Sequence, residues 1–302
     1  MSWSGWDETA GKSTSKTESE SSIVITGMSF KIGSVVVGLD APLFLMAGPC
    51  VIESEEGCLQ IAERLVEISQ STRVGIIFKA SFDKANRSSI SSFRGPGLAQ
   101  GMKILAKVRV RTGLPVMTDI HEPAQAVEAA QTVDCLQVPA FLCRQTDLLC
   151  ACAETGRPIS VKKGQFLSPT EMGNVVDKIK ACKNDKVILT ERGTFFGYNR
   201  LVNDMTGIAV MQQFGCPVVF DATHSTQQPG GLGAASGGRR EMAPLLARAA
   251  VAAGANGLFL EVHPKPDKAL SDAASMLPLD WLEDLVRVCS AIFEITHGHR
   301  KS

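Results

Sequence analysis

Reactive side chains follow most of the short apolar runs in this sequence, and the positively charged ones form a first group. Lysine acts as a point charge, and arginine binds phosphate or carboxylate through two parallel hydrogen bonds. Cations gathered at the mouth of one binding pocket would repel one another unless anions filled the pocket. The group therefore predicts substrates with several negative charges, the alternative being that each cation is an ordinary solvated residue. Its members are Lys79, Lys84, Arg87, Lys162 and Arg192, with Arg144 nearby.

A second group combines one thiol, one imidazole and two carboxylates, at Cys50, His224, Glu261 and Asp272. This mixture of donors suits Fe²⁺, Zn²⁺ or Mn²⁺. No short ligand spacing supports it, so alternatives stay open. Cys50 can be a small buried residue, His224 a hydrogen-bonded loop residue, and the two acids an ion pair or a helix cap. A divalent-metal site is the hypothesis that the group generates.

Composition narrows the class of protein. The formal net charge is zero, so nucleic acid and anionic membrane are not expected partners, and any affinity for anions must be local. No apolar run reaches the roughly 18 residues of a transmembrane helix. The nine cysteines are irregularly spaced and include no CxxC pair. That pattern is typical of reduced thiols, and we expect a cytoplasmic protein.

The chain divides into a tail and one domain. Residues 1–21 are rich in Ser, Thr and Glu and lack the apolar stretch of a signal peptide, so we expect a flexible tail. Residues 22–302 have the length and apolar content of a single large domain.

Eight apolar runs separated by amphipathic segments indicate the elements that must position the reactive residues. Runs of this kind are typical of a parallel sheet covered by helices. Eight strand–helix repeats predict an α/β fold of the (β/α)₈ (TIM) barrel type, with a doubly wound sheet as the second choice. The runs are Leu43–Ala47, Val74–Phe78, Leu114–Thr118, Cys135–Val138, Ile159–Val161, Val187–Leu189, Val218–Phe220 and Gly257–Leu260.

Segments outside these repeats predict further features. Ser22–Thr26, Phe30–Ile32 and Val35–Val37 flank Gly27 and Gly33, which favours a β-hairpin that closes the amino-terminal end of the barrel. Leu277-Pro278 has the form of a helix start. The glycine-rich residues 227–240 favour a lid, and they contain no nucleotide-binding glycine motif.

The barrel fold explains why residues far apart in sequence can share one site. In TIM barrels the active site forms at the carboxyl ends of the strands. Nearly every predicted strand here leads into reactive residues, such as Lys79 after the second strand and Asp119 and His121 after the third. Both groups described above are therefore expected on one rim.

Several long segments resemble the 3-deoxy-D-manno-octulosonate 8-phosphate (KDO8P) synthase family, in order along residues 42–290. Chance agreement over such long motifs is very improbable. The segments are 79–89 (KASFDKANRSS), 93–97 (FRGPG), 137–147 (QVPAFLCRQTD), 161–166 (VKKGQF), 221–225 (DATHS) and 235–238 (ASGG).

This resemblance implies a homotetrameric TIM-barrel transferase of lipopolysaccharide biosynthesis. Its reaction is the condensation of phosphoenolpyruvate with D-arabinose 5-phosphate and water, giving KDO8P and inorganic phosphate. Phosphoenolpyruvate is expected at Lys79, Gln137, Lys162 and Arg192. Arabinose 5-phosphate is expected at Lys84, Asn86, Arg87 and Ser88, with Arg144 supplied by a neighbouring subunit.

The same resemblance assigns chemistry to the second group. Metal-dependent members carry cysteine where metal-independent members carry asparagine, and this chain has Cys50 there. The family thus implies metal ligation by Cys50, His224, Glu261 and Asp272. As a mechanistic hypothesis beside this, we expect Lys84 to protonate the developing alkoxide and His224 or Asp272 to handle protons.

Three rival functions remain. The related 3-deoxy-arabino-heptulosonate 7-phosphate synthases use erythrose 4-phosphate and usually carry a Lys-Pro-Arg-Thr segment where this chain has residues 84–88 (KANRS). A Schiff-base aldolase would use Lys79 or Lys162. A non-catalytic barrel would only bind phosphorylated ligands.

Overall fold

A closed barrel of parallel strands forms the centre of the molecule. The computed structural model describes residues 29–87, 89–195, 197–229 and 237–298. Within these residues, eight strands pair in chain order, and β14 closes the ring by pairing with both β11 and β3. The barrel strands are β3 (Phe44–Gly48), β4 (Gly75–Lys79), β5 (Val116–Asp119), β6 (Cys135–Val138), β7 (Ile159–Lys162), β8 (Val187–Glu191), β11 (Val218–Asp221) and β14 (Gly257–His263).

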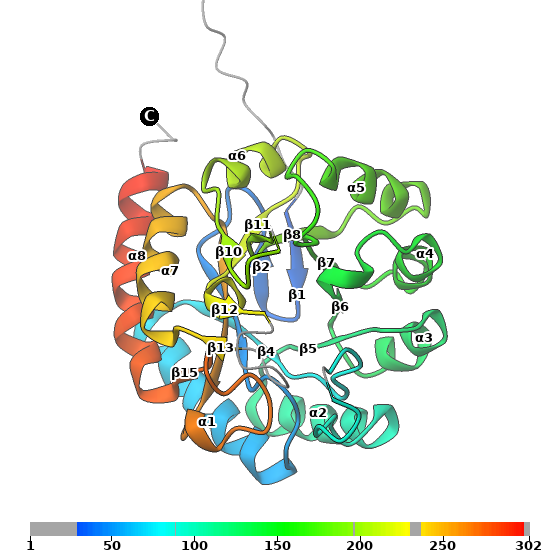
Figure 1. Ribbon diagram of the computed structural model, residues 1–302, viewed down its shortest axis with the longest axis vertical. Coiled ribbons are helices and arrows are strands. Elements are labelled where there is room, and N and C mark those ends of the chain that lie inside the picture. The colour runs from blue at the N-terminus through cyan, green and yellow to red at the C-terminus, as the bar shows by residue number, and fades with distance from the viewer. Residues whose placement is uncertain (1–28, 88, 196, 230–236, 299–302) are drawn as a thin grey trace, which may run out of the picture.

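Helices surround this barrel and cover its outer face (Figure 1). The last helix packs against α7 and α1, which closes the outer ring beside the first strand. Among the described residues, no helix has the length and apolarity needed to cross a membrane. The helices are α1 (Glu55–Thr72), α2 (Leu98–Thr112), α3 (Pro123–Ala130), α4 (Thr146–Glu154), α5 (Met172–Ala181), α6 (Thr206–Gln212), α7 (Ala243–Ala252) and α8 (Leu282–Gly298).

The predicted TIM barrel is therefore confirmed, and shorter elements decorate its ends. Two-residue strands pair as β9 with β10 and as β12 with β13. These strands and the 3₁₀ helices are β9 (Thr194–Phe195), β10 (Leu201–Val202), β12 (Gln227–Gln228), β13 (Gly237–Gly238), η1 (Ala140–Leu142), η2 (His224–Thr226), η3 (Arg240–Met242), η4 (Pro266–Lys268) and η5 (Leu279–Trp281).

The apolar residues of the barrel strands divide into two cores, because successive side chains of a strand point to opposite faces. One set, including Leu45, Phe78 and Leu260, faces outward and packs with the helices. The alternate set faces the barrel interior and forms a separate buried cluster. Its strand members are Phe44, Met46, Ile77, Met117, Cys135, Ile188, Val219 and Phe259.

An antiparallel hairpin covers the amino-terminal end of this interior cluster, as the sequence predicted. Strand β1 (Phe30–Ile32) pairs with β2 (Val35–Val37), and both lie at the centre of the ring of helices (Figure 1). Ile32, Val35 and Val37 are buried in the same cluster as Phe44 and Met46. The predicted tail, residues 1–21, and Ser22–Thr26, which the hairpin prediction included, lie outside the described residues.

One predicted helix start is wrong. Leu277-Pro278 forms a short strand, β15 (Leu277–Pro278), that pairs in parallel with Val262 and His263 of β14. The cause is the length of β14, which continues past the predicted end at Leu260 and offers a free edge beyond the barrel. Helix α8 begins only at Leu282, after η5.

The hairpin turn provides a stability test. Gly33 has φ +56°, and a Cβ added there would lie 2.8 Å from Cβ of Pro115. Gly113 also has positive φ, +73°, but has open space around its Cα. A left-handed residue with a Cβ costs roughly 1–2 kcal/mol. We expect Gly113→Ala to lose about that much and Gly33→Ala clearly more, because Pro115 must also move.

Urea unfolding followed by circular dichroism measures both variants against the parent chain. Equal losses of unfolding free energy would show that Pro115, which directly precedes β5, does not limit the size of residue 33.

Candidate active site

The alternation of side chains along the barrel strands, which separates the two cores, also places the polar residues that form the floor of the site. Lys79 follows inward-facing Ile77 by two residues, so the two side chains share the interior face of β4. Six strands make this step from an apolar to a polar residue at their carboxyl ends. The steps are Ile77 to Lys79, Met117 to Asp119, Cys135 to Gln137, Ile188 to Thr190, Val219 to Asp221 and Phe259 to Glu261.

A cavity of about 760 Å³ opens above this floor and gathers most of the predicted substrate-binding residues. Cys50 and Glu261 are buried next to it, 0% and 1% exposed. Ser88 lies outside the described residues. Arg144 is exposed and lines a separate, smaller pocket with Lys178. The predicted residues that line the large cavity are Lys79, Lys84, Asn86, Arg87, Gln137, Lys162, Arg192, His224 and Asp272.

Cys50 reaches the site through a close approach of two strand ends. A Cβ on Gly48 would lie 2.2 Å from the carbonyl oxygen of Lys79, so only glycine allows β3 to leave the barrel against β4. Beyond it, Ser81 donates its backbone N–H to the carbonyl of Cys50, and Ile52 donates to that of Ser81. These contacts fix the turn that carries the thiol.

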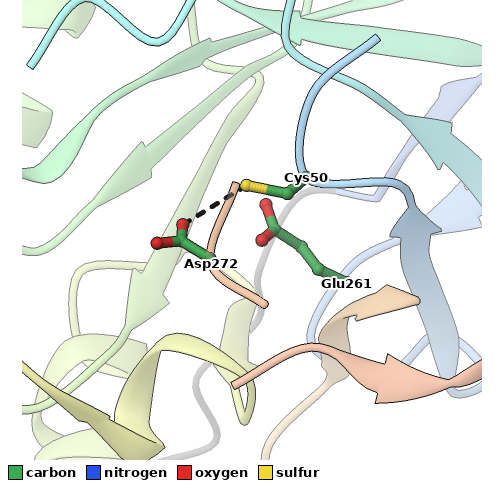
Figure 2. Close-up of side chains that lie close together, drawn as sticks. All are labelled: Cys50, Glu261 and Asp272. Atoms are coloured by element: carbon green, nitrogen blue, oxygen red, sulfur yellow. Dashed lines mark hydrogen bonds between the residues drawn. The ribbon is translucent and has the colours of Figure 1, made fainter. Parts of the chain in front are cut away.

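The four predicted metal-binding residues lie around one point. Ligand atoms of Cys50, Glu261 and Asp272 all fall within 4.8 Å of one another (Figure 2). The Cys50 Sγ lies 3.3 Å from Oδ2 of Asp272. His224 presents Nε2 to the same group, 3.5 Å from Glu261 and 3.8 Å from Asp272. A thiol, an imidazole and two carboxylates thus converge from the turn after β3, from η2, from β14 and from the loop after η4.

The donor set fits a divalent cation. Oε2 of Glu261 is buried and has no hydrogen-bond partner in the described part of the chain, although it faces His224. Burial, and next the charge of Glu261, raise the pKa of the Cys50 thiol well above its ordinary value. A cation at this point would satisfy the carboxylate oxygen and favour the thiolate.

His224 is oriented from the other side of its ring. Its Nδ1 lies 2.7 Å from Oδ2 of Asp221, which is fully buried. Burial opposes ionisation of Asp221, but the charges of His224 and Lys162 outweigh it and hold its pKa far below the ordinary value. An ionised carboxylate behind a histidine is the usual partner that fixes the ring of a metal ligand.

Lys79 sits at the centre of a buried charge network. Its Nζ lies 3.2 Å from Glu261, 3.5 Å from Asp119 and 2.9 Å from Oγ of Ser81. Burial opposes ionisation of both acids, but the cations outweigh it. The pKa of Asp119 lies well below its ordinary value because of Lys79, and that of Glu261 falls to about 2 because of His224, Lys84 and Lys79.

Lys162 and its neighbour in sequence have different roles. Lys162 donates to Asp221 at 2.7 Å and lies 3.8 Å above the Phe259 ring. Burial lowers its pKa below 10.5. Lys163 points away from the cavity and donates to the carbonyl oxygens of Leu167, Gly164 and Gly193. One lysine of the pair faces the cavity, and the other holds loops.

Four other side chains of the cavity have unpaired polar atoms. Nη1 of Arg192, Oε1 of Gln137, Oε1 of Gln165 and Nδ1 of His121 are buried without hydrogen-bond partners in the described part of the chain. All four residues line the cavity. Buried polar atoms in native proteins normally have partners, so these are positions where a ligand completes the hydrogen bonding.

The Asp272 loop is held at both sides. Glu53 accepts the backbone N–H of Leu270 at 2.7 Å, and Arg87 donates to Oγ of Ser271 at 2.7 Å. Asp272 itself has φ +49°, and its carbonyl accepts from Ser275 and Met276. The carboxylate is therefore positioned by a fixed turn.

Sequence reasoning did not identify every residue of the site. Asp119 and His121 were recognised only as strand-end residues, and Phe259, Gln165 and Ser271 were not recognised at all. The inward-facing period of the strands would have found Phe259, because Glu261 follows it by two residues. Ser271 and Gln165 lie on loops, whose conformation the strand pattern does not fix.

Comparisons with known proteins agree with this architecture. Residues 15–297 match the model of the DAHP synthetase I family. The chain is 54% identical over 272 residues to the 2-dehydro-3-deoxyphosphooctonate aldolase of Syntrophotalea carbinolica, covering 90% of this chain and 98% of that protein. It is 57% identical over 261 residues to the protein of that name from Geobacter metallireducens, covering 86% and 96%. These matches span nearly the whole barrel, and the chain belongs to the DAHP synthetase I family.

Proposed function

We propose that this protein is a KDO8P synthase, which condenses phosphoenolpyruvate with D-arabinose 5-phosphate and water and releases inorganic phosphate. One observation carries the proposal: Lys79, Lys84, Lys162 and Arg192 converge on one cavity, beside the Cys50 cluster. The name of the relatives, 2-dehydro-3-deoxyphosphooctonate aldolase, supports the eight-carbon product over the heptulosonate alternative.

Phosphoenolpyruvate binds deepest, against Lys79, Gln137, Lys162 and Arg192. These residues are 1%, 2%, 6% and 5% exposed, so the charges of the two lysines and the arginine are poorly screened by water. The unpaired Nη1 of Arg192 and Oε1 of Gln137 support this assignment, because they require a polar partner. Two anionic groups of phosphoenolpyruvate match the surplus of cations.

Arabinose 5-phosphate binds nearer the mouth, along residues 84–88. Asn86 is exposed, and Arg87 lies on the cavity lining between the mouth and the Asp272 loop. In this arrangement the aldehyde end of the sugar points down toward the Cys50 cluster, and the phosphate stays at the rim. Ser88 and a neighbouring subunit's copy of residue 144 complete the phosphate subsite in the proposed homotetramer, which we expect in the cytoplasm.

Cys50, His224, Glu261 and Asp272 hold the divalent ion, Fe²⁺, Zn²⁺ or Mn²⁺. When bound, such an ion supplies a Lewis acid for the aldehyde or for the attacking water. Asp221 keeps Nε2 of His224 turned toward this position by binding Nδ1. Glu53 and Arg87 keep the Asp272 turn in place.

Lys84 protonates the alkoxide that forms as C3 of phosphoenolpyruvate attacks the aldehyde carbon. Its Nζ lies 3.9 Å from Glu261. Burial opposes its charge, but Cys50, Glu261 and Asp119 outweigh burial and raise its pKa well above 10.5. It therefore enters the reaction as an ammonium. Water then adds to C2, and the C2–O bond to phosphate breaks. In this proposal His224 and Asp272 handle the protons of these steps.

Arg192→Ala should raise KM for phosphoenolpyruvate roughly 10- to 100-fold, since a hydrogen bond to a charged group contributes about 1.5–3 kcal/mol. KM for arabinose 5-phosphate should change much less. Steady-state kinetics with each substrate varied measures both. The matched control is Arg111→Ala, which removes an exposed arginine that pairs with Glu63 on the outer helices. An unchanged KM for phosphoenolpyruvate would remove Arg192 from this subsite.

Cys50→Ala should lower divalent-metal affinity and abolish the thiolate charge-transfer absorption of the Co²⁺-substituted protein. Elemental analysis after dialysis, together with that spectrum, measures the loss without relying on activity. Cys58→Ala is the control, because Cys58 is also buried, at 2% exposure, but lies in the helix core. If both variants retained metal equally, ligation by Cys50 would be wrong.

Phosphate release with arabinose 5-phosphate or erythrose 4-phosphate tests the reaction itself. We expect release with the five-carbon sugar, loss on chelation, and recovery with Mn²⁺ or Fe²⁺. Preference for erythrose 4-phosphate would favour the heptulosonate reaction. Trapping of a borohydride-stable adduct would indicate a Schiff base at Lys79 or Lys162, and no turnover with either sugar would indicate a binding protein.

A further inference from the structure

Two cysteines outside the active site lie in direct contact. Cys150 on α4 and Cys182, which directly follows α5, have their sulfur atoms 2.7 Å apart. All nine cysteines are within the described residues, and these two are the ones that are partly exposed; the other seven are buried. Neither lines the active-site cavity. The contact has no role in the proposed reaction.

The surrounding structure holds the two sulfurs in place. Asn184, two residues after Cys182, is buried and donates its side-chain N–H groups to the carbonyls of Ala153 and Arg157, at the end of α4. Between Cys182 and Asn184 the chain turns at Lys183, which has φ +62°. The position of Cys182 is thus anchored to the helix that carries Cys150, and α4 and α5 are neighbours in the outer ring (Figure 1).

We propose that Cys150 and Cys182 are a redox-sensitive pair that forms a reversible disulfide between α4 and α5. A disulfide holds its sulfurs about 2.05 Å apart, so small side-chain movements separate the reduced pair from the bonded one. Partial exposure admits a small oxidant such as a peroxide. In a reducing compartment, disulfides of this kind are usually transient and sense oxidation.

The chemistry balances with hydrogen peroxide as the oxidant. One thiolate attacks the peroxide, the O–O bond breaks, and a sulfenic acid and hydroxide form. The second sulfur then attacks the sulfenic sulfur, the S–O bond breaks, and hydroxide leaves. Two thiols lose two electrons and two protons in total, and the peroxide becomes two molecules of water.

The reduced pair is not highly reactive at neutral pH. The side-chain hydrogen bond shared with Cys182, and next burial, raise the pKa of Cys150 to about 11. The negative charges of Glu154 and Asp147 act in the same direction. Oxidation should therefore be slow and accelerate as pH rises, because the thiolate is the nucleophile.

The test treats the full-length, metal-loaded protein with hydrogen peroxide, blocks remaining thiols by alkylation, and maps tryptic peptides without reduction. Cys150 and Cys152 fall on one tryptic peptide, residues 145–162, because Pro158 blocks cleavage after Arg157. The experiment therefore uses Cys152→Ala, which removes the neighbouring thiol on the core face of α4. We expect a cross-linked peptide pair with the loss of two alkylatable thiols, both reversed by dithiothreitol.

Cys150→Ala and Cys182→Ala should each lose the cross-link while keeping the activity of the untreated protein. The oxidised protein should also melt at a higher temperature than the reduced protein, because the bond closes a loop in the unfolded chain. Oxidation of both sulfurs to separate sulfinic acids would overturn the proposal. So would a cross-link formed by other cysteines in place of this pair.

Discussion

The site depends on one geometric constraint, the alternation of side chains along the barrel strands. Each strand that places an apolar residue in the interior must place the residue two positions later in the same interior, one layer nearer the carboxyl end. Lys79, Gln137 and Glu261 occupy that layer above Ile77, Cys135 and Phe259. Because the barrel is closed by the pairing of β14 with β3, these positions form a ring. Side chains nearly two hundred residues apart meet for this reason alone.

Burial then decides how the ring can be charged. Isolated ions at such depth would be very unfavourable, and both buried lysines of the floor have acidic partners: Lys79 has Glu261 and Asp119, and Lys162 has Asp221. These two lysines face three carboxylates, and Lys84, Arg87 and Arg192 bring three further cations to the cavity lining. The positive charge of the cavity therefore comes mainly from these three further cations. This charge attracts anionic substrates while the floor remains stable in their absence.

The contrast between the apolar starts and the polar carboxyl ends of the strands explains how far the sequence could predict the structure. The starts of the strands agree with the apolar runs to within two residues, because burial on both faces requires continuous apolar sequence. Their ends were placed one to three residues early on most strands. There the inward-facing residue is polar, as at Lys79, Asp119 and Lys162, and the apolar run stops while the strand continues. Composition could not separate Lys162 from Lys163, because only the phase of the strand tells which one faces the cavity.

Asp272 marks the limit of that reasoning, because no strand positions it. Its left-handed backbone and the contacts of Glu53 and Arg87 with the neighbouring residues Leu270 and Ser271 are tertiary features. Arg87 therefore has two connections: it lines the cavity where the sugar phosphate is proposed to bind, and it holds the turn that carries a proposed metal ligand. An anion that drew the guanidinium toward the mouth would also act on the Ser271 contact. If the sugar and the metal bind as proposed, sugar binding and the geometry of the metal site are linked through this one side chain.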